Sequence, residues 1–149
     1  MSEKLASLAP PLRLPAPVLD ELKRVARTGY PHEVCGLLIG RENGTFIGVD
    51  RITQAANLST DRLADRYTLD PDDFLAADTA ARRDGLGIVG IWHTHPDHPP
   101  RPSRTDLEAA WEGYTYVILS VGRKGVADTR AWRLAGAQFI EQSIEETKP

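Results

Sequence analysis

The sequence is poor in cysteine, and this limits how the fold can be stabilised. Cys35 is the single cysteine among 149 residues, which excludes a disulfide within the chain. Small secreted domains usually depend on several disulfides, so we expect a cytoplasmic protein. The first residues also lack the apolar core of a signal peptide, because Pro10 and Pro11 soon interrupt the chain.

Long apolar runs and an excess of positive charge are also missing. No run approaches the roughly 20 apolar residues that cross a bilayer, so we expect no membrane association. The 18 Lys and Arg residues are outnumbered by 21 Asp and Glu residues and form no basic stripe. We therefore expect no nucleic-acid partner. With 41% hydrophobic residues, the chain can bury one core, and we predict a poorly ordered Pro-rich segment over 1–14 followed by a single domain over 15–149.

The spacing of apolar residues predicts an α+β fold, in which helices pack on a mixed β-sheet. Helix start signals precede two of the predicted helices: Asp70-Pro71-Asp72-Asp73 and Ser103. We predict helices over 15–29, 70–83 and 103–114, and strands over 34–40, 45–53, 66–69, 86–95, 115–121, 126–134 and 139–145.

One stretch, Trp92-His93-Thr94-His95-Pro96, suggests chemistry. It ends an apolar run that is typical of a buried strand, and residues two apart on a strand point to the same face. His93 and His95 therefore project side by side, and Thr94 faces away. Two imidazoles held this way can bind a metal, although a satisfied polar pair would give the same pattern.

Two carboxylates can join the histidines. A stiff loop with four prolines leads from Pro96 to Ser103, which is a suitable N-cap. Asp106 then lies in the first helical turn and faces back toward the histidines. Glu33 stands immediately before the strand predicted over 34–40, where it can act as a base toward a metal-bound water. Alone, Ser103 is explained as a helix cap and Glu33 as a solvated turn residue.

Together these residues resemble the JAMM, or MPN-plus, family of zinc metalloproteases. The family pattern is an upstream Glu, then His-x-His, seven residues, Ser, two residues and Asp. Here it is Glu33, His93-Thr94-His95, Pro96 to Pro102, Ser103, Arg104-Thr105 and Asp106. Asn57 and the segment from Arg66 to Pro71 also look like the family, most of all like its small stand-alone bacterial members. The resemblance covers roughly residues 15 to 135 and is specific, because several spaced residues must coincide.

The resemblance implies the cytidine deaminase-like JAMM/MPN architecture and a role for each motif residue. His93, His95 and Asp106 would bind one Zn²⁺ per chain. Glu33 would accept a proton from the attacking water and pass it to the leaving amine, and Ser103 would stabilise the developing oxyanion. The expected substrate is a ubiquitin-like or sulfur-carrier protein, cleaved at or beyond its C-terminal Gly-Gly tail. Family members often pair, so a homodimer is a further expectation.

Two other functions remain open at this point. Relatives that lost the ligands act as non-catalytic protein-binding modules, but this ligand set is intact. A structural zinc domain would need a fourth side-chain ligand. His32, His98 and Cys35 are the available candidates, and none has ligand-like spacing. We interpret the two histidines as surface residues and Cys35 as a small buried hydrophobe, with a thiolate ligand as the alternative.

Overall fold

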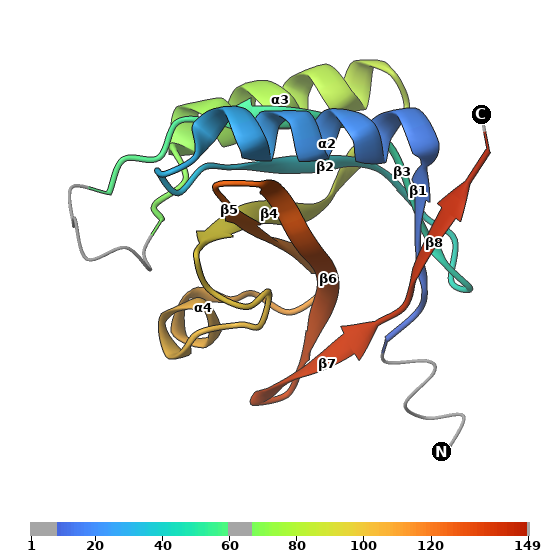
Figure 1. Cartoon of the computed structure of the whole chain (residues 1–149). Coiled ribbons are helices and arrows are strands. Elements are labelled where there is room, and N and C mark those ends of the chain that lie inside the picture. The colour runs from blue at the N-terminus through green and yellow to red at the C-terminus, as the bar shows by residue number, and fades with distance from the viewer. Residues whose placement is uncertain (1–8, 60–66, 149) are drawn as a thin grey trace.

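The computed structural model describes residues 9–59 and 67–148. Within these residues, eight strands form one mixed sheet, and three helices pack around it (Figure 1). This confirms the α+β prediction. The elements, in chain order, are β1 (Leu12–Pro15), α2 (Ala16–Gly29), β2 (Cys35–Glu42), β3 (Ile47–Ala55), α3 (Pro71–Arg83), β4 (Gly87–Pro96), α4 (Arg104–Ala109), β5 (Thr115–Gly122), β6 (Gly125–Ala135), β7 (Gln138–Gln142) and β8 (Ile144–Thr147).

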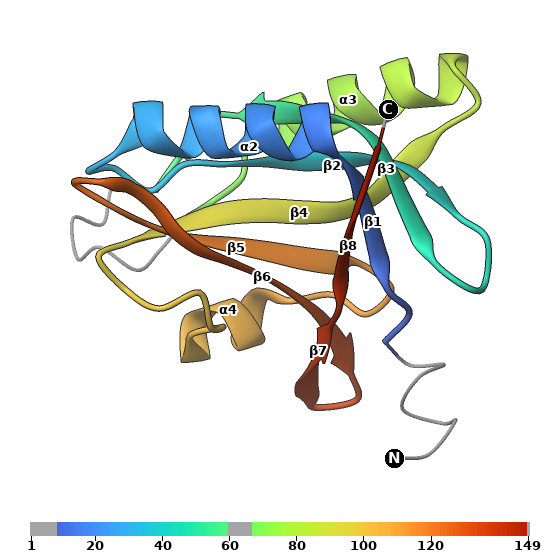
Figure 2. The same ribbon diagram turned by 45° about the vertical axis from the view of Figure 1, so that its right-hand side comes forward.

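The sheet order is β7-β6-β5-β4-β2-β3-β1-β8, so the histidine-bearing strand β4 lies in the middle. β4 pairs with β2 in antiparallel and with β5 in parallel orientation. The two edge strands, β7 and β8, follow each other across Ser143. The sheet therefore curls until its edges meet, as Figure 2 shows. The prediction of one last strand over 139–145 is wrong, because the chain bends at Ser143 and passes from one edge to the other.

The N-terminal boundary also differs from the prediction. Leu12 and Leu14 belong to β1 and are fully buried. β1 lies between β3 and β8, so poor order over 1–14 is wrong for residues 12–14. β1 has only four residues and follows two prolines, so its apolar residues show no period in the sequence. Residues 1–8 lie outside the described part of the chain.

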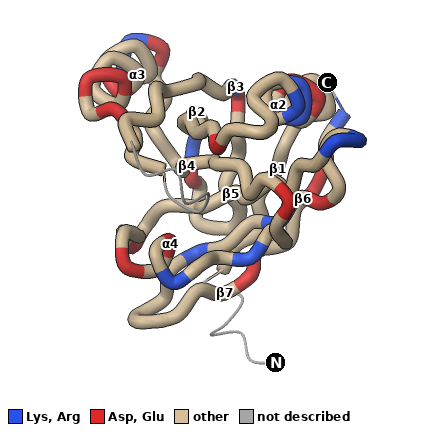
Figure 3. Tube along the Cα trace, turned by 60° about the vertical axis from the view of Figure 1, so that its left-hand side comes forward, with Lys and Arg blue, Asp and Glu red and all other residues tan. Residues whose placement is uncertain are grey.

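The helix starts follow the predicted chemistry. The Asp70 side chain accepts a hydrogen bond from the Asp72 backbone N–H at 2.9 Å, and Pro71 occupies the first helical position of α3. Figure 3 shows both acidic and basic residues along α3. Two of them, Asp78 and Arg82, form an ion pair at 3.1 Å. No helix in the described residues is both long and apolar enough to cross a membrane.

Two other predictions need correction. α4 has six residues and ends at Ala109, so Trp111 and Tyr114 follow the helix instead of continuing it. Tyr114 still packs against the core, whereas Trp111 is 59% exposed. The predicted short strand over 66–69 is reduced to one bridge between Leu69 and Asn57, and Arg66 lies outside the described residues.

The sheet buries different residues on its two faces. The apolar side of α2 packs on one face, where Trp92 and Leu38 lie, and α3 covers the other, where Ile91 and Leu37 lie. Because side chains alternate along β4, Trp92 and Thr94 point toward the α2 side. His93 and His95 point to the opposite side.

The position of Trp92 depends on a glycine. Gly36 pairs with Trp92 across β2 and β4, and the indole N–H donates to the Thr53 carbonyl at 3.0 Å. A Cβ added at Gly36 would lie 1.9 Å from that carbonyl oxygen and 2.5 Å from the indole nitrogen. The space over Gly36 is therefore already filled.

We expect Gly36→Ala to lower the free energy of unfolding by about 2–3 kcal/mol, because backbone must move to admit the methyl group. Urea unfolding measures this change. Gly87→Ala is the matched control, since Gly87 lies on β4 with nothing within 4 Å of an added Cβ. Equal stability of the two variants would contradict the packing argument.

Candidate metal centre

The two histidines occupy the end of β4 and are shielded from solvent. His93 is fully buried, and His95 is 5% exposed. Their Nε2 atoms lie 3.2 Å apart. The strand geometry thus brings both imidazoles to one point, as their spacing predicts.

Asp106 joins them through the N-terminal turn of α4. The Asp106 backbone N–H donates to the Ser103 Oγ at 3.0 Å, and the Ser103 N–H donates to the Asp106 Oδ2 at 2.8 Å. This reciprocal capping box fixes the Asp106 carboxylate, which is 7% exposed. The carboxylate reaches His95 Nε2 at 3.1 Å and His93 Nε2 at 3.3 Å.

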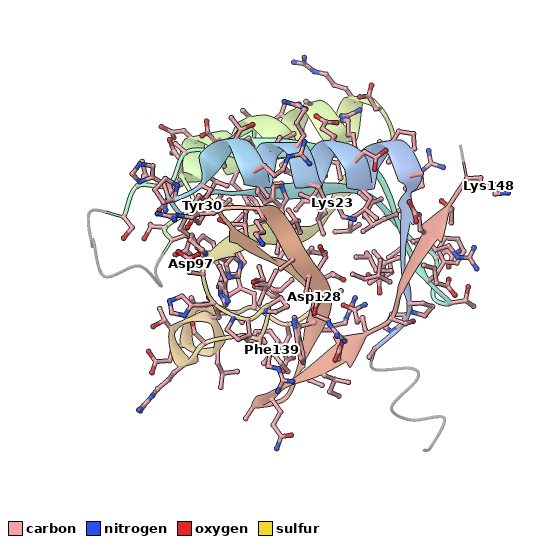
Figure 4. All side chains as sticks on the ribbon, viewed as in Figure 1. Lys23, Tyr30, Asp97, Asp128, Phe139 and Lys148 are labelled. Atoms are coloured by element: carbon pink, nitrogen blue, oxygen red, sulfur yellow. The ribbon has the colours of Figure 1, made fainter. Side chains whose placement is uncertain are left out.

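The loop between the histidines and α4 is held by backbone carbonyls. His95 Nδ1 contacts the Pro99 carbonyl at 2.9 Å. From β6, the Trp132 indole N–H donates to the Pro100 carbonyl at 3.0 Å. From β5, Ser120 Oγ donates to the His98 carbonyl at 2.5 Å. Nearby, the Tyr30 hydroxyl contacts both carboxylate oxygens of Asp97 at 2.9 Å, and Figure 4 shows the two side chains together. The loop is therefore anchored to the sheet and to the end of α2.

The distances within this cluster fit a tetrahedral ion. Zinc bonds nitrogen and carboxylate oxygen at about 2.0–2.2 Å, so two ligands at tetrahedral angles lie roughly 3.3–3.5 Å apart. The His93 and His95 Nε2 atoms lie 3.2 Å apart, and Asp106 meets them with different oxygens, Oδ1 at 3.3 Å from His93 and Oδ2 at 3.1 Å from His95. These separations are close to those between tetrahedral zinc ligands.

The protonation of these groups follows from the same contacts. Burial alone would raise the pKa of Asp106, but hydrogen bonds from His93 and His95 outweigh it and hold that pKa well below its usual range. Burial lowers the pKa of His93. It acts the same way on His95, but hydrogen bonds with Asp106 and the Pro99 carbonyl reverse the effect and raise its pKa. These contacts thus favour an ionised Asp106 and a neutral His93, the forms in which a carboxylate and an imidazole bind a metal.

Glu33 reaches the cluster because of the register between β2 and β4. Cys35 pairs with His93, and the Thr94 N–H donates to the Val34 carbonyl at 2.9 Å. Continued by two residues, this register sets Glu33 opposite His95, on the same face of the sheet. A carboxylate oxygen of Glu33 and one nitrogen of each histidine lie within 4.8 Å of one another.

Two sets of three donors can therefore be drawn, one with Asp106 and one with Glu33. Asp106 contacts both imidazoles directly, at distances close to a tetrahedral edge, and its orientation is fixed by the Ser103 N–H. Of the two carboxylates, Asp106 is therefore the better placed to hold a metal ion together with the histidines.

Three further residues contact the site, although no pattern in the sequence assigns them a role. The ring of Tyr67 stacks on His93, with centroids 4.3 Å apart. Asn57 Nδ2 donates to the Glu33 carbonyl at 3.1 Å. Thr94, on the opposite face from the histidines, accepts a hydrogen bond from the Val34 N–H at 2.9 Å. Family-like positions could have drawn attention to Asn57 and Tyr67, but only folding shows what they touch.

The remaining candidate ligands stay outside the cluster. His32 and His98 are exposed. Cys35 is fully buried, its Sγ lies 3.7 Å from the Ala55 carbonyl, and it is not among the donors that converge with the histidines. Burial and the nearby Glu33 raise the pKa of its thiol to about 12. These features match a small buried hydrophobe.

The model of the family described as prokaryotic homologs of the JAB domain matches residues 15–135. The chain belongs to this family. The resemblance seen in the sequence is therefore confirmed over the same residues.

Relatives in this family are named for proteolytic activities. A desampylase from Haloferax volcanii is 34% identical, over 89% of this chain and 94% of the relative. A probable TtuB-protein conjugate cleaving protease from Thermus thermophilus is 33% identical, over 87% of this chain and 80% of the relative. The prediction of a peptidase is thus confirmed at the level of the family.

A solved structure supports the fold. The solution structure of a protein from Desulfitobacterium hafniense matches with a TM-score of 0.82 at 27% identity, over 93% of this chain and 94% of that one. Nearly the whole chain therefore takes an arrangement already seen in a relative.

The state of Cys35 can be tested with an alkylating reagent. With a pKa of about 12 and no solvent exposure, the thiol should resist iodoacetamide at pH 8 in the folded protein. It should react fully in denaturant, which mass spectrometry records. Rapid modification of the folded protein would reopen the thiolate alternative.

Proposed function

We propose that this protein is a zinc-dependent peptidase that acts on conjugates of ubiquitin-like or sulfur-carrier proteins. It hydrolyses the peptide or isopeptide bond at or beyond their C-terminal Gly-Gly tail. The observation that carries the proposal is the convergence of two imidazoles and one carboxylate, at 3.1–3.3 Å, with Glu33 beside them. The names of the relatives, a desampylase and a conjugate cleaving protease, support this substrate class.

In this proposal, His93 Nε2, His95 Nε2 and an Asp106 carboxylate oxygen hold the zinc. Three protein ligands leave the fourth tetrahedral position for water, as in catalytic zinc sites. Zinc, when bound, supplies a Lewis acid that polarises the scissile carbonyl and lowers the pKa of its water.

Glu33 serves as the proton carrier. Glu33 is half-buried, its two carboxylate oxygens are shielded from solvent, and one of them lies within 4.8 Å of a nitrogen of each histidine. It removes a proton from the attacking water and delivers it to the departing amine, which is a single carboxylate acting as base and then as acid.

The cap at the start of α4 uses the oxygen of the Ser103 hydroxyl and leaves its proton available. As helix cap, its oxygen accepts the Asp106 N–H through a lone pair. The hydroxyl proton can therefore be donated to the carbonyl oxygen of the substrate as negative charge develops there.

The two alternatives fare less well. A binding module that lost its ligands would have no reason to keep two imidazoles and a carboxylate within 3.1–3.3 Å contacts of one another. A structural zinc site would need a fourth side chain. His32 and His98 are exposed and Cys35 does not join the converging donors, so Glu33 is the remaining candidate, and the Glu33→Gln variant below tests it.

The decisive experiment separates metal binding from turnover. His95→Ala and Asp106→Ala should lose zinc, since each removes one of three ligands. Glu33→Gln should keep about one zinc per chain and lose about 10²–10⁴-fold in kcat. Zinc is measured by elemental analysis. Turnover is measured on a ubiquitin-like protein joined through its Gly-Gly carboxyl to a lysine side chain or, in a second arm, to a cysteine amino group.

Asp128→Asn is the matched carboxylate control, because the Asp128 side chain on β6 is 45% exposed and pairs with Arg130. It should retain both zinc and turnover. Loss of zinc in Glu33→Gln would make Glu33 a ligand, and full activity in that variant would remove it as the base. Zinc without turnover in wild type, over both substrate arms, would support the structural alternative.

A separate variant tests Ser103. Ser103→Gly should cost only a few tenths of a kcal/mol in stability, because glycine is tolerated at an N-cap. If the hydroxyl stabilises the oxyanion, kcat should fall about 10²–10³-fold with zinc retained. Unchanged turnover would reduce Ser103 to a helix cap.

A further inference from the structure

The two ligand histidines are supported differently. A metal-binding histidine usually donates its second ring N–H to an oxygen, which fixes the plane of the ring. His95 has such a partner in the Pro99 carbonyl, 2.9 Å from Nδ1. His93 Nδ1 is buried and has no hydrogen-bond partner among the described residues.

An aromatic ring packs on the face of the His93 imidazole. The rings of Tyr67 and His93 are stacked, with centroids 4.3 Å apart and planes inclined by 25°. A ring stacked in this way restricts rotation of the imidazole, which would otherwise have to push the neighbouring ring aside.

The segment that carries Tyr67 is itself fastened to the site. Asn57 Oδ1 accepts the Thr68 N–H at 2.8 Å, and the Leu58 N–H donates to the Thr68 carbonyl at 2.7 Å. The same Asn57 side chain donates to the Glu33 carbonyl at 3.1 Å. One amide therefore links the backbone next to Tyr67 with the backbone of Glu33.

We propose that Tyr67 is a positioning residue of the metal centre, whose ring takes the place of a hydrogen bond and holds His93 with Nε2 toward Asp106. This inference rests on the zinc site proposed above and adds a residue to it. It assigns the role to the aromatic ring of Tyr67 and none to its hydroxyl.

The test compares zinc affinities by competition with a chromophoric chelator. Tyr67→Phe keeps the ring, so its affinity should stay within about two-fold of wild type. Tyr67→Leu removes the stack and should weaken zinc binding about 10–100-fold, the usual effect of losing a residue that orients a ligand. The absorption spectrum of the cobalt(II)-loaded proteins gives a second readout, which should change in Tyr67→Leu alone.

Phe139→Leu is the matched control. Phe139 (Figure 4) packs in the same apolar cluster, edge-on to Tyr116 at 5.7 Å. This variant loses aromatic packing without touching a ligand and should bind zinc as wild type does. Circular dichroism in the presence of chelator verifies that each variant is folded before affinities are compared.

The outcomes separate this inference from the proposed function. Wild-type affinity in Tyr67→Leu, or equal losses in Tyr67→Phe and Tyr67→Leu, would overturn the positioning role and leave the zinc site intact. An equal loss in Phe139→Leu would reduce the effect to general packing. Failure of the wild-type protein to bind zinc would instead refute the proposed function.

Discussion

The site depends on the register between β2 and β4. The backbone of Thr94 donates to the Val34 carbonyl, while the Thr94 hydroxyl accepts the Val34 N–H. These two bonds lock the strands where Glu33 stands across from His95. A slip by one residue would turn every side chain of one strand to the other face of the sheet. Glu33 would then point away from the histidines, and the site would lose its candidate base.

The alternation along β4 divides structural and chemical roles between the two faces of the sheet. Trp92 is fully buried on the α2 side, where its indole ties β4 to Thr53 of β3 across Gly36. The imidazoles project from the other side, next to the cluster that contains Ile91 and Tyr67. Tight packing on one face thus fixes the backbone from which the two imidazoles project on the other, which is how a rigid scaffold preorganises a site.

The sequence predicts the centre of this molecule better than its edges. The alternation of His93 and His95 and the capping signal at Ser103 are short-range patterns, and the structure contains both. The pairing of β1 with β8 joins residues about 130 positions apart, and no local pattern reports it. The bend at Ser143 is also not visible in the sequence, because the residues on both sides of it have strand character.

The convergence of Glu33 lies between these cases. Its position before a strand was visible, but its distance from the histidines depends on a register set by two strands 60 residues apart. The family pattern supplied that link in the sequence, and the geometry now gives its physical cause.

The convergence of polar groups leaves His95 with more acceptors than it can serve. It faces two of them, Asp106 and the Pro99 carbonyl. A neutral imidazole has one N–H and can serve only one of them. A metal ion held by Nε2 would remove the conflict, because the remaining Nδ1–H would then serve the Pro99 carbonyl alone. The hydrogen bonds around His95 are therefore satisfied either by an added proton or by the ion, which is the competition expected of a metal site.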